Sequence, residues 1–248
     1  MKFSAAIALS FSLICMSSCT KDDSNDSGDT GEVTDDSSTV TDTGSTSDTG
    51  TITTTATETG DPVSLDYDDS ISIQANLDNG VPILNILEHH EVSELHGLFY
   101  EGGYIFYIDE STGSGMVSHS ITDSGPTHWN DFSNPAPDLG LGSEIGTGEA
   151  NTNAIVGAIG EDTYAARYAY DAEINGFNDW FLPSIDELTA VYENLHLAGL
   201  GDANGGSSYW SSTDEEVQYA WVIYFANGNT YTPNKTHEHH NVLPVRSF

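Results

Sequence analysis

The chain has 248 residues and carries 5 basic against 39 acidic side chains, a formal net charge of −34. Nucleic acids are bound through clustered Lys and Arg, so this balance excludes a general nucleic-acid binder. Both cysteines, Cys15 and Cys19, lie within the first twenty residues, so the rest of the chain can form no disulfide, thiolate metal site or cysteine nucleophile. The part that folds must do so by packing alone.

The first residues have the pattern of a secretory signal peptide. Lys2 provides a positive start, and the apolar stretch 3–16 is too short to span a bilayer. Small residues precede Cys19, an arrangement that resembles the lipobox of bacterial lipoproteins. The resemblance implies removal of residues 1–18, lipid attachment at Cys19, and anchoring at the outer membrane or cell surface. An ordinary signal peptide with incidental cysteines is the alternative.

Residues 19–62 consist largely of Ser, Thr, Asp and Gly, with almost no large apolar side chain. Such a segment buries too little surface to offset the entropy of ordering, so we expect a disordered tether. Apolar residues then recur at helical spacing over 83–87 and 92–98. They predict two short helical turns within 63–98, an adaptor that packs on the domain after it.

From residue 99 onward the pattern changes to strands and capped helices. Period-two alternation and turn signals predict strands at 104–108, 116–119, 208–212, 219–226, 229–232 and 242–248. Helical patterns cover 151–159 and 163–172, divided by Gly160, after a Pro-, Gly- and Asp-rich surface loop at 121–148. Mixed strands with a few helices, without alternating βαβ units, predict an α+β domain over 99–248.

Two turn signals are specific enough to predict local geometry. Ser184 and Glu187 have the spacing of a capping box, so a helix should begin there and end near Gly199. Asn227-Gly228 predicts a type I′ hairpin turn, which requires positive φ at both residues.

Six sequence blocks resemble, in order, the C-terminal domain of the Legionella collagen-like protein. They are GGYIFYIDE (102–110), IGTGEANTNAIV (145–156), NDWFLPSIDEL (178–188), YWSST (209–213), AWVIYFANGNTY (220–231) and VLPVRSF (242–248). The resemblance implies a C-type lectin-like fold with a two-part antiparallel sheet, flanking helices and chain ends close together. It also implies a secreted or surface-exposed domain, since the namesake is an adhesin that binds sulfated glycosaminoglycans.

Two departures from that family bear on function. The chain has no Gly-X-Y stalk, so a collagen-driven trimer is not implied. From Glu94 onward only three basic residues stand against 22 acidic ones, which makes sulfated glycans poor ligands. Arg246, one of these three, is expected in a structural ion pair, and its candidate partners are Asp186, Asp214 and Glu215.

Aromatic residues are the first candidates for a binding site. Trp129 lies in the polar loop beside Asn130 and Asp131, where it could stack on a sugar ring. The same three residues spell the tripeptide that supplies calcium ligands in sugar-binding C-type lectins, but there the tripeptide lies near the end of the domain. Chance explains it better, and calcium stays possible without being indicated. The core should hold the other tryptophans, Trp180, Trp210 and Trp221.

Two polar segments are further candidates. Asn227, Asn229 and Tyr231 form an exposed hairpin tip, and loops on a rigid scaffold often bind ligands. His237 and His239 would share one face of a strand and could hold a zinc or nickel ion. A solvated His-rich loop explains the histidines better, and whether a metal binds stays open.

Enzyme motifs are missing from the sequence. It contains no Gly-x-Ser-x-Gly elbow, P-loop or HExxH motif. Formylglycine-generating enzymes share the C-type lectin-like fold, but their active site is built on cysteines that this domain lacks. We therefore expect a surface-anchored, non-catalytic, adhesin-like lipoprotein without a cofactor, which recognises a neutral glycan or a protein. The alternative is a structural or protein-interaction domain of the cell envelope with no small ligand.

Overall fold

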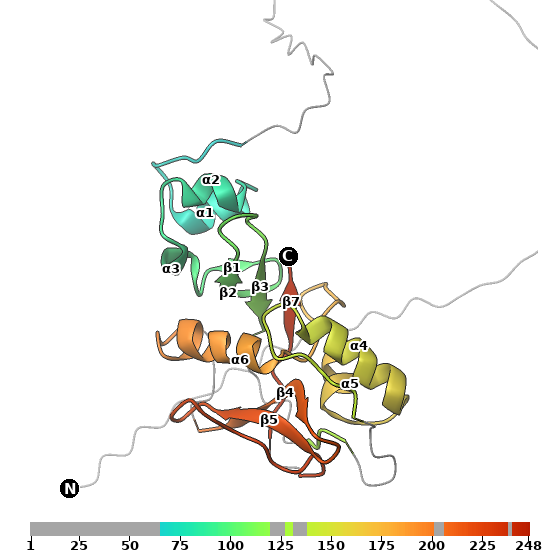
Figure 1. Cartoon of the computed structure of the whole chain (residues 1–248). Helices are drawn as coiled ribbons and strands as arrows, with labels where there is room; N and C mark the ends of the chain where they lie inside the picture. The colour runs from blue at the N-terminus through green and yellow to red at the C-terminus, as the bar shows by residue number, and fades with distance from the viewer. Residues whose placement is uncertain (1–64, 120–126, 131–137, 201–205, 238–239) are drawn as a thin grey trace, which may run out of the picture. The chain divides into compact units, whose positions relative to one another are not determined.

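Two antiparallel sheets and six short α-helices make up the part of the chain that the structure describes (Figure 1). The computed structural model describes residues 65–119, 127–130, 138–200, 206–237 and 240–248, all within one unit that spans 59–248. The α+β class predicted from the sequence is confirmed. The signal peptide, Cys19 and the whole of the predicted tether, 19–62, lie outside the described residues.

Three short helices precede the first strand: α1 (Ile73–Asp78), α2 (Ile83–Leu87) and α3 (Val92–Leu95). The last two match the predicted turns, whereas α1 was not predicted. It begins where the Ser72 side chain accepts a hydrogen bond from the Ala75 amide. Leu95 shares a buried cluster with Val117 and Trp180, so the predicted adaptor packs on the strands that follow it.

The first sheet joins the beginning and the end of the domain. Its order is β1-β2-β3-β7, formed by β1 (Phe99–Tyr100), β2 (Gly103–Ile108), β3 (Gly115–Ser118) and β7 (Val245–Ser247). The rings of Tyr100 and Phe248 meet edge to face, with centroids 5.0 Å apart. Residues near 99 and 248 therefore lie side by side, as the family resemblance implied.

The second sheet contains the hairpin, whose turn differs from the prediction. Its strands are β4 (Ser208–Glu215), β5 (Tyr219–Tyr224) and β6 (Asn229–Tyr231). Gly228 has φ +72°, but Asn227 does not have positive φ, and Tyr224 pairs with Asn229 across a four-residue connection. The type I′ prediction is wrong, because the Tyr224 carbonyl accepts from the amides of Asn227 at 3.2 Å and Gly228 at 2.8 Å, and a four-residue connection replaces the two-residue turn.

Three more helices follow the sequence signals closely. They are α4 (Gly148–Ile159), α5 (Ala165–Tyr170) and α6 (Ile185–Val191), the last continued by a π-helical turn, Tyr192–His196. Gly160 ends α4 with φ +84°, and Gly199 adopts φ +68° after the π turn, the left-handed geometry that favours glycine. Within the described ranges no helix is long and apolar enough to span a membrane.

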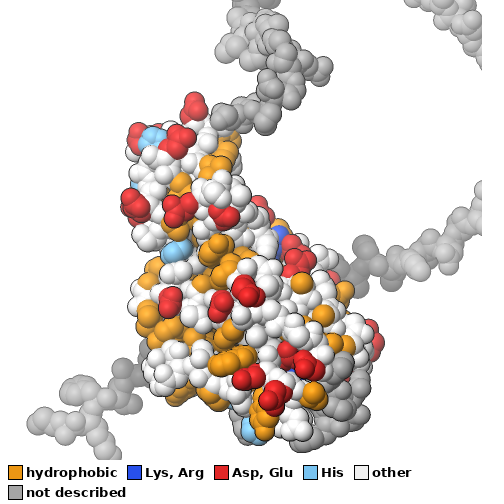
Figure 2. Space-filling view, viewed as in Figure 1, with side chains coloured by type: hydrophobic (Ala, Val, Ile, Leu, Met, Phe, Trp, Pro, Cys, Tyr) orange, Lys and Arg blue, Asp and Glu red, His pale blue; other side chains and the backbone are white. Residues whose placement is uncertain are grey.

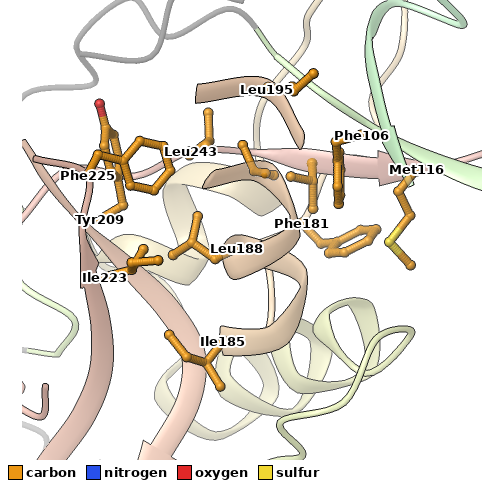
Figure 3. Close-up of a cluster of buried hydrophobic side chains, with 12 residues drawn as sticks. Phe106, Met116, Phe181, Ile185, Leu188, Leu195, Tyr209, Ile223, Phe225 and Leu243 are labelled. Carbon is orange, nitrogen blue, oxygen red and sulfur yellow. The ribbon is translucent and has the colours of Figure 1, made fainter. Parts of the chain in front are cut away.

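Helix α6 lies between the two sheets (Figure 1). It contacts β2 on one side and β4 and β5 on the other. Figure 3 shows Leu188 of α6 within the cluster of apolar side chains that includes Phe106 of β2 and Ile223 of β5. The opposite face of β5 is covered as well, because Val222 packs with Trp210 in a second cluster. Strand β5 is therefore central to the packing of this domain.

A buried carboxylate fixes the start of α6 to the start of α4. The capping box is confirmed, since Ser184 Oγ accepts from the Glu187 amide and Glu187 Oε2 accepts from the Ser184 amide at 2.8 Å. Glu187 Oε1 also accepts from the amides of Gly146 at 2.8 Å and Gly148 at 3.2 Å. Burial raises the pKa of Glu187 despite these three donors. One side chain thus ties two segments about forty residues apart.

Replacing this carboxylate should destabilise the domain. Glu187→Ala leaves three backbone N–H groups without their acceptor, so we expect the free energy of unfolding to fall by about 2–4 kcal/mol in urea titrations. Glu193→Ala, an exposed change in the π turn that follows, should stay within about 0.5 kcal/mol of wild type. Equal effects of the two substitutions would contradict this role of Glu187.

Candidate functional site

A pocket opens between α4, the end of α5 and the segment that leads into α6. Its volume is about 200 Å³, which is less than the ~300–1,000 Å³ typical of pockets that enclose drug-sized ligands. The lining consists of Glu149, Thr152, Asn153, Tyr170, Asn178, Asp179, Trp180 and Phe181. A site of this size suits one small polar unit, such as a single sugar ring.

The floor of the pocket is rigid. Thr152 Oγ1 accepts from the Leu182 amide at 3.0 Å and lies 3.2 Å from the Leu182 carbonyl, which it reaches as a donor. Trp180 and Phe181 are almost fully buried, and the Trp180 indole donates to the Phe177 carbonyl at 3.2 Å. These bonds hold α4 against the segment 178–182, so the pocket walls are positioned before any ligand arrives.

The rim carries polar groups that the described fold leaves unused. Glu149, Asn153 and Asn178 are exposed, and their side chains have no hydrogen-bond partner among the described residues. Tyr170 is 44% exposed, and its ring is available on the same rim. Amides donate and accept, carboxylates accept, and an aromatic face packs on apolar surface. The combination suits a ligand rich in hydroxyl groups.

Asp179 is the one rim residue with an intramolecular ion pair. Arg246 donates to both of its oxygens, through Nε at 2.7 Å and Nη2 at 2.8 Å. This pair lowers the pKa of Asp179, with the hydrogen bonds from Arg246 as the largest cause. The carboxylate is therefore ionised and held in one orientation, while about half of it remains exposed to solvent.

Arg246 is itself fixed on every side. Its Nη1 donates to the Glu101 carbonyl at 2.7 Å, and its guanidinium lies 3.9 Å from the centroid of the Phe177 ring. The predicted ion pair therefore exists, but with Asp179 in place of Asp186, Asp214 or Glu215. The reason is strand register, because the bridge between Phe181 and Val245 brings Asp179 beside Arg246.

Two of the six sequence blocks, 145–156 and 178–188, supply every lining residue except Tyr170. A comparison with protein-family models matches residues 126–246 to the Lcl C-terminal domain. This part of the chain is an Lcl C-terminal domain. The match starts after the first block, covers the next four and ends within the last. No curated protein matches the chain well enough to count as a relative. Family membership indicates a surface-type binding domain.

A second hollow lies outside the matched region. Its volume is about 380 Å³, and it is lined by Asp66, Tyr67, Asn85, Glu88 and His89. Tyr67 is already engaged within the fold. Its ring stacks on His89 with centroids 4.6 Å apart, and its hydroxyl contacts His90 Nε2. The first pocket alone is built from the blocks of the Lcl C-terminal domain, so we take it as the candidate site.

Each described Lys and Arg of the Lcl C-terminal domain forms an ion pair within the domain. Lys235 pairs with Asp214 at 3.1 Å, and both side chains are only 3% exposed. Burial lowers the pKa of Lys235, although Asp214 opposes the shift. Arg167 of α5 pairs with Glu161, which precedes the helix, and with Asp171, which follows it. On the face drawn in Figure 2, acidic side chains far outnumber basic ones, so polyanions find little to bind there.

The expectation that Trp129 stacks on a sugar from a surface loop is corrected by the structure. Its side chain is 0% exposed, and its indole donates to the Ser211 carbonyl at 2.8 Å. Lys235 Nζ covers the ring at 4.3 Å from the centroid. Asn130 is also buried, and its side-chain oxygen has no partner among the described residues. Asp131 lies outside those residues.

The other predicted site residues lie away from the pocket. Asn227, Asn229 and Tyr231 are exposed on the hairpin, as expected, but none of them lines the cavity. His237 is exposed, and His239 lies outside the described part of the chain. No group of three His, Cys, Asp or Glu suited to a metal occurs among the residues described. Trp180 and Trp210 are buried as predicted, and Trp221 is partly buried.

Sequence reasoning missed the pocket residues Glu149, Asn153, Tyr170 and Asn178. A usable signal existed, because Glu149, Asn153 and Asn178 lie in two of the family blocks. No structural role within those blocks accounts for these three side chains. Polar, exposed side chains inside a family block point to binding more than to packing.

Trp129 should be required for folding. Trp129→Ala removes a fully buried indole and exposes the Lys235–Asp214 pair, so we expect a loss of about 3–5 kcal/mol in the free energy of unfolding. Tyr231→Ala, at a 43% exposed aromatic, should cost less than about 1 kcal/mol. Normal stability of Trp129→Ala in thermal and urea denaturation would show that the indole is not part of the core.

The Asp179–Arg246 pair should make stability fall in acid. Because the folded pKa of Asp179 lies below its ordinary value of 3.8, the pair contributes fully above that value, and its contribution is lost as the pH falls through the folded pKa. Asp179→Asn should lower the free energy of unfolding by about 1–2 kcal/mol near neutral pH, since the carboxylate is half exposed.

Urea titrations at a series of pH values check this prediction. The difference between wild type and Asp179→Asn should shrink as the pH drops below about 4. Glu110→Gln, an exposed change in the β2–β3 turn, should show no such difference at any pH. A constant difference for Asp179→Asn across the acid range would rule out the ion pair as its source.

Proposed function

We propose that this Lcl C-terminal domain binds a neutral glycan in the pocket between α4, α5 and the segment 178–181. The observation that carries the proposal is the convergence of two family blocks on one cavity whose rim amides have no hydrogen-bond partner in the described part of the chain. Hydroxyl groups of a sugar both donate and accept, which matches Asn153 and Asn178. The ring of Tyr170 offers a surface for the apolar face of the sugar.

The charge distribution supports a neutral ligand over a sulfated one. Sulfates are usually bound by Arg and Lys in charge-assisted hydrogen bonds. The pocket lining contains neither Arg nor Lys, and Arg246 already donates hydrogen bonds to the lining residue Asp179. A sulfated sugar placed there would lie beside the carboxylate of Glu149, with no cation in the lining to offset the repulsion. This departs from the ligand class that the family resemblance implied.

The wider setting belongs to the same proposal. We propose that the domain is displayed at the outer membrane or cell surface through a lipid on Cys19, and that it works as a non-catalytic, adhesin-like module without a cofactor. The charge of the chain, −34, argues against nucleic acid as a partner. A protein ligand, or a purely structural role in the envelope, is the competing function.

Glycan binding should depend on the rim residues. For a neutral oligosaccharide that binds wild type on a glycan array, Asn153→Ala and Asn178→Ala should each weaken affinity about three- to tenfold, because each removes hydrogen bonds to hydroxyls. Tyr170→Ala should weaken it about tenfold, because it removes the stacking surface. Isothermal titration calorimetry with the purified protein measures these changes.

Tyr168→Ala is the matched control, since Tyr168 lies on the same helix with 45% exposure but does not line the pocket. It should bind like wild type. If the wild-type protein binds nothing on a broad array of neutral glycans and an envelope protein co-purifies with it, the competing function is favoured. Equal losses for Tyr168→Ala and Tyr170→Ala would show that binding does not use the pocket.

A further inference from the structure

Glu149 is a lining residue whose charge nothing in the pocket balances. It lies in the first turn of α4, where the helix dipole favours a carboxylate. Its side chain is exposed, and no ion pair or hydrogen bond engages it within the described residues. The pocket lining contains no Lys, Arg or His. Because Glu149 belongs to the lining, a ligand bound in the pocket would lie beside this carboxylate.

The second acidic side chain of the pocket, Asp179, differs in this respect. Both of its oxygens already accept from Arg246, which neutralises its charge. Arg167 lies near the opposite wall, 5.7 Å from the Tyr170 ring centroid, but it is paired with Glu161 and Asp171. The uncompensated charge of the pocket is therefore that of Glu149.

An aromatic ring and a carboxylate in one small pocket attract a cation of moderate size. An ammonium group near a carboxylate gains from the opposite charge, and it gains further over the face of a tyrosine. The amides of Asn153 and Asn178, which bond to no other described residue, add recognition of hydroxyl groups on the same rim. A ligand that satisfies all of these groups carries an amine and several hydroxyls on one ring.

We propose that the pocket prefers an amino sugar with an unsubstituted amine, a hexosamine unit whose ammonium pairs with Glu149 while its hydroxyls bond to the rim amides. This inference rests on the proposed glycan function and changes its charge class, because the preferred unit is a cation and neutral sugars are the weaker ligands of the same pocket. N-acetylation removes the positive charge and adds bulk, so the acetylated sugar binds as an ordinary neutral unit. A sulfated hexosamine is disfavoured, because its anion meets the uncompensated carboxylate of Glu149.

The test compares matched oligosaccharides on the purified protein by titration calorimetry at about 0.15 M salt, where long-range attraction to the acidic chain is largely screened. The probes are a glucosamine oligomer, its N-acetylated form and a glucose oligomer of the same length. Wild type should bind the glucosamine oligomer about three- to tenfold more tightly than the other two. Glu149→Gln should abolish that preference, so that the glucosamine oligomer and the glucose oligomer bind with equal affinity.

Glu110→Gln removes one exposed charge away from the pocket and should keep the preference. A preference that survives Glu149→Gln, or that Glu110→Gln removes equally, would overturn the inference while leaving the glycan function intact. Equal binding of Nα-acetyl-lysine amide and the glucosamine oligomer would show that the site reads an amine alone, which also overturns it. Failure of all three oligomers to bind would overturn the glycan function and the inference together.

Discussion

The ion pair between Arg246 and Asp179 links the last strand of the chain to the segment that forms one wall of the pocket. With no cysteine beyond residue 19, the domain has no covalent cross-link between these segments. In place of a cross-link, Arg246 donates hydrogen bonds to Asp179 and to the Glu101 carbonyl, and its guanidinium lies over the ring of Phe177. A guanidinium suits this position because its fork of donors engages a carboxylate and a carbonyl together.

Glu187 performs the corresponding task for the other wall. Its carboxylate accepts from backbone amides at the start of α4 and from the Ser184 amide at the start of α6. The bonds between Thr152 and Leu182 add a second link between the same two segments. The two family blocks are thus fixed to each other by buried polar contacts, and a preformed pocket loses less entropy when a ligand binds.

Local signals in the sequence were sufficient wherever neighbouring residues decide the structure. The capping box at Ser184, the glycine that ends α4 and the strand pattern of β2 were all predictable, because each depends on a few adjacent side chains. The turn at Asn227 was not, since pairing ends at Tyr224 and Asn229, and the four-residue connection between them includes Phe225, whose ring packs in the core with residues distant in sequence.

Tertiary contacts also explain the errors about the site. Trp129 has polar neighbours in sequence, yet Lys235 and the Ser211 carbonyl enclose it in the fold. Arg246 was correctly expected in an ion pair, but its partner depends on strand register that no local pattern reveals. The pocket combines α4, α5 and the segment before α6, so its composition emerges only when those segments are brought together.

Placing the cations inside the fold determines what the surface can attract. Each of Arg167, Lys235 and Arg246 neutralises a carboxylate of the same domain, so the remaining acidic side chains carry the field that an approaching ligand meets. That field repels polyanions and attracts cations over roughly a Debye length, about 8 Å at physiological salt. It acts on every cationic ligand alike, so discrimination among ligands has to come from the short-range contacts of the pocket. A domain of the same family with surface-exposed Lys and Arg would select the opposite class of ligand on an unchanged backbone, because fold and ligand charge are set by different residues.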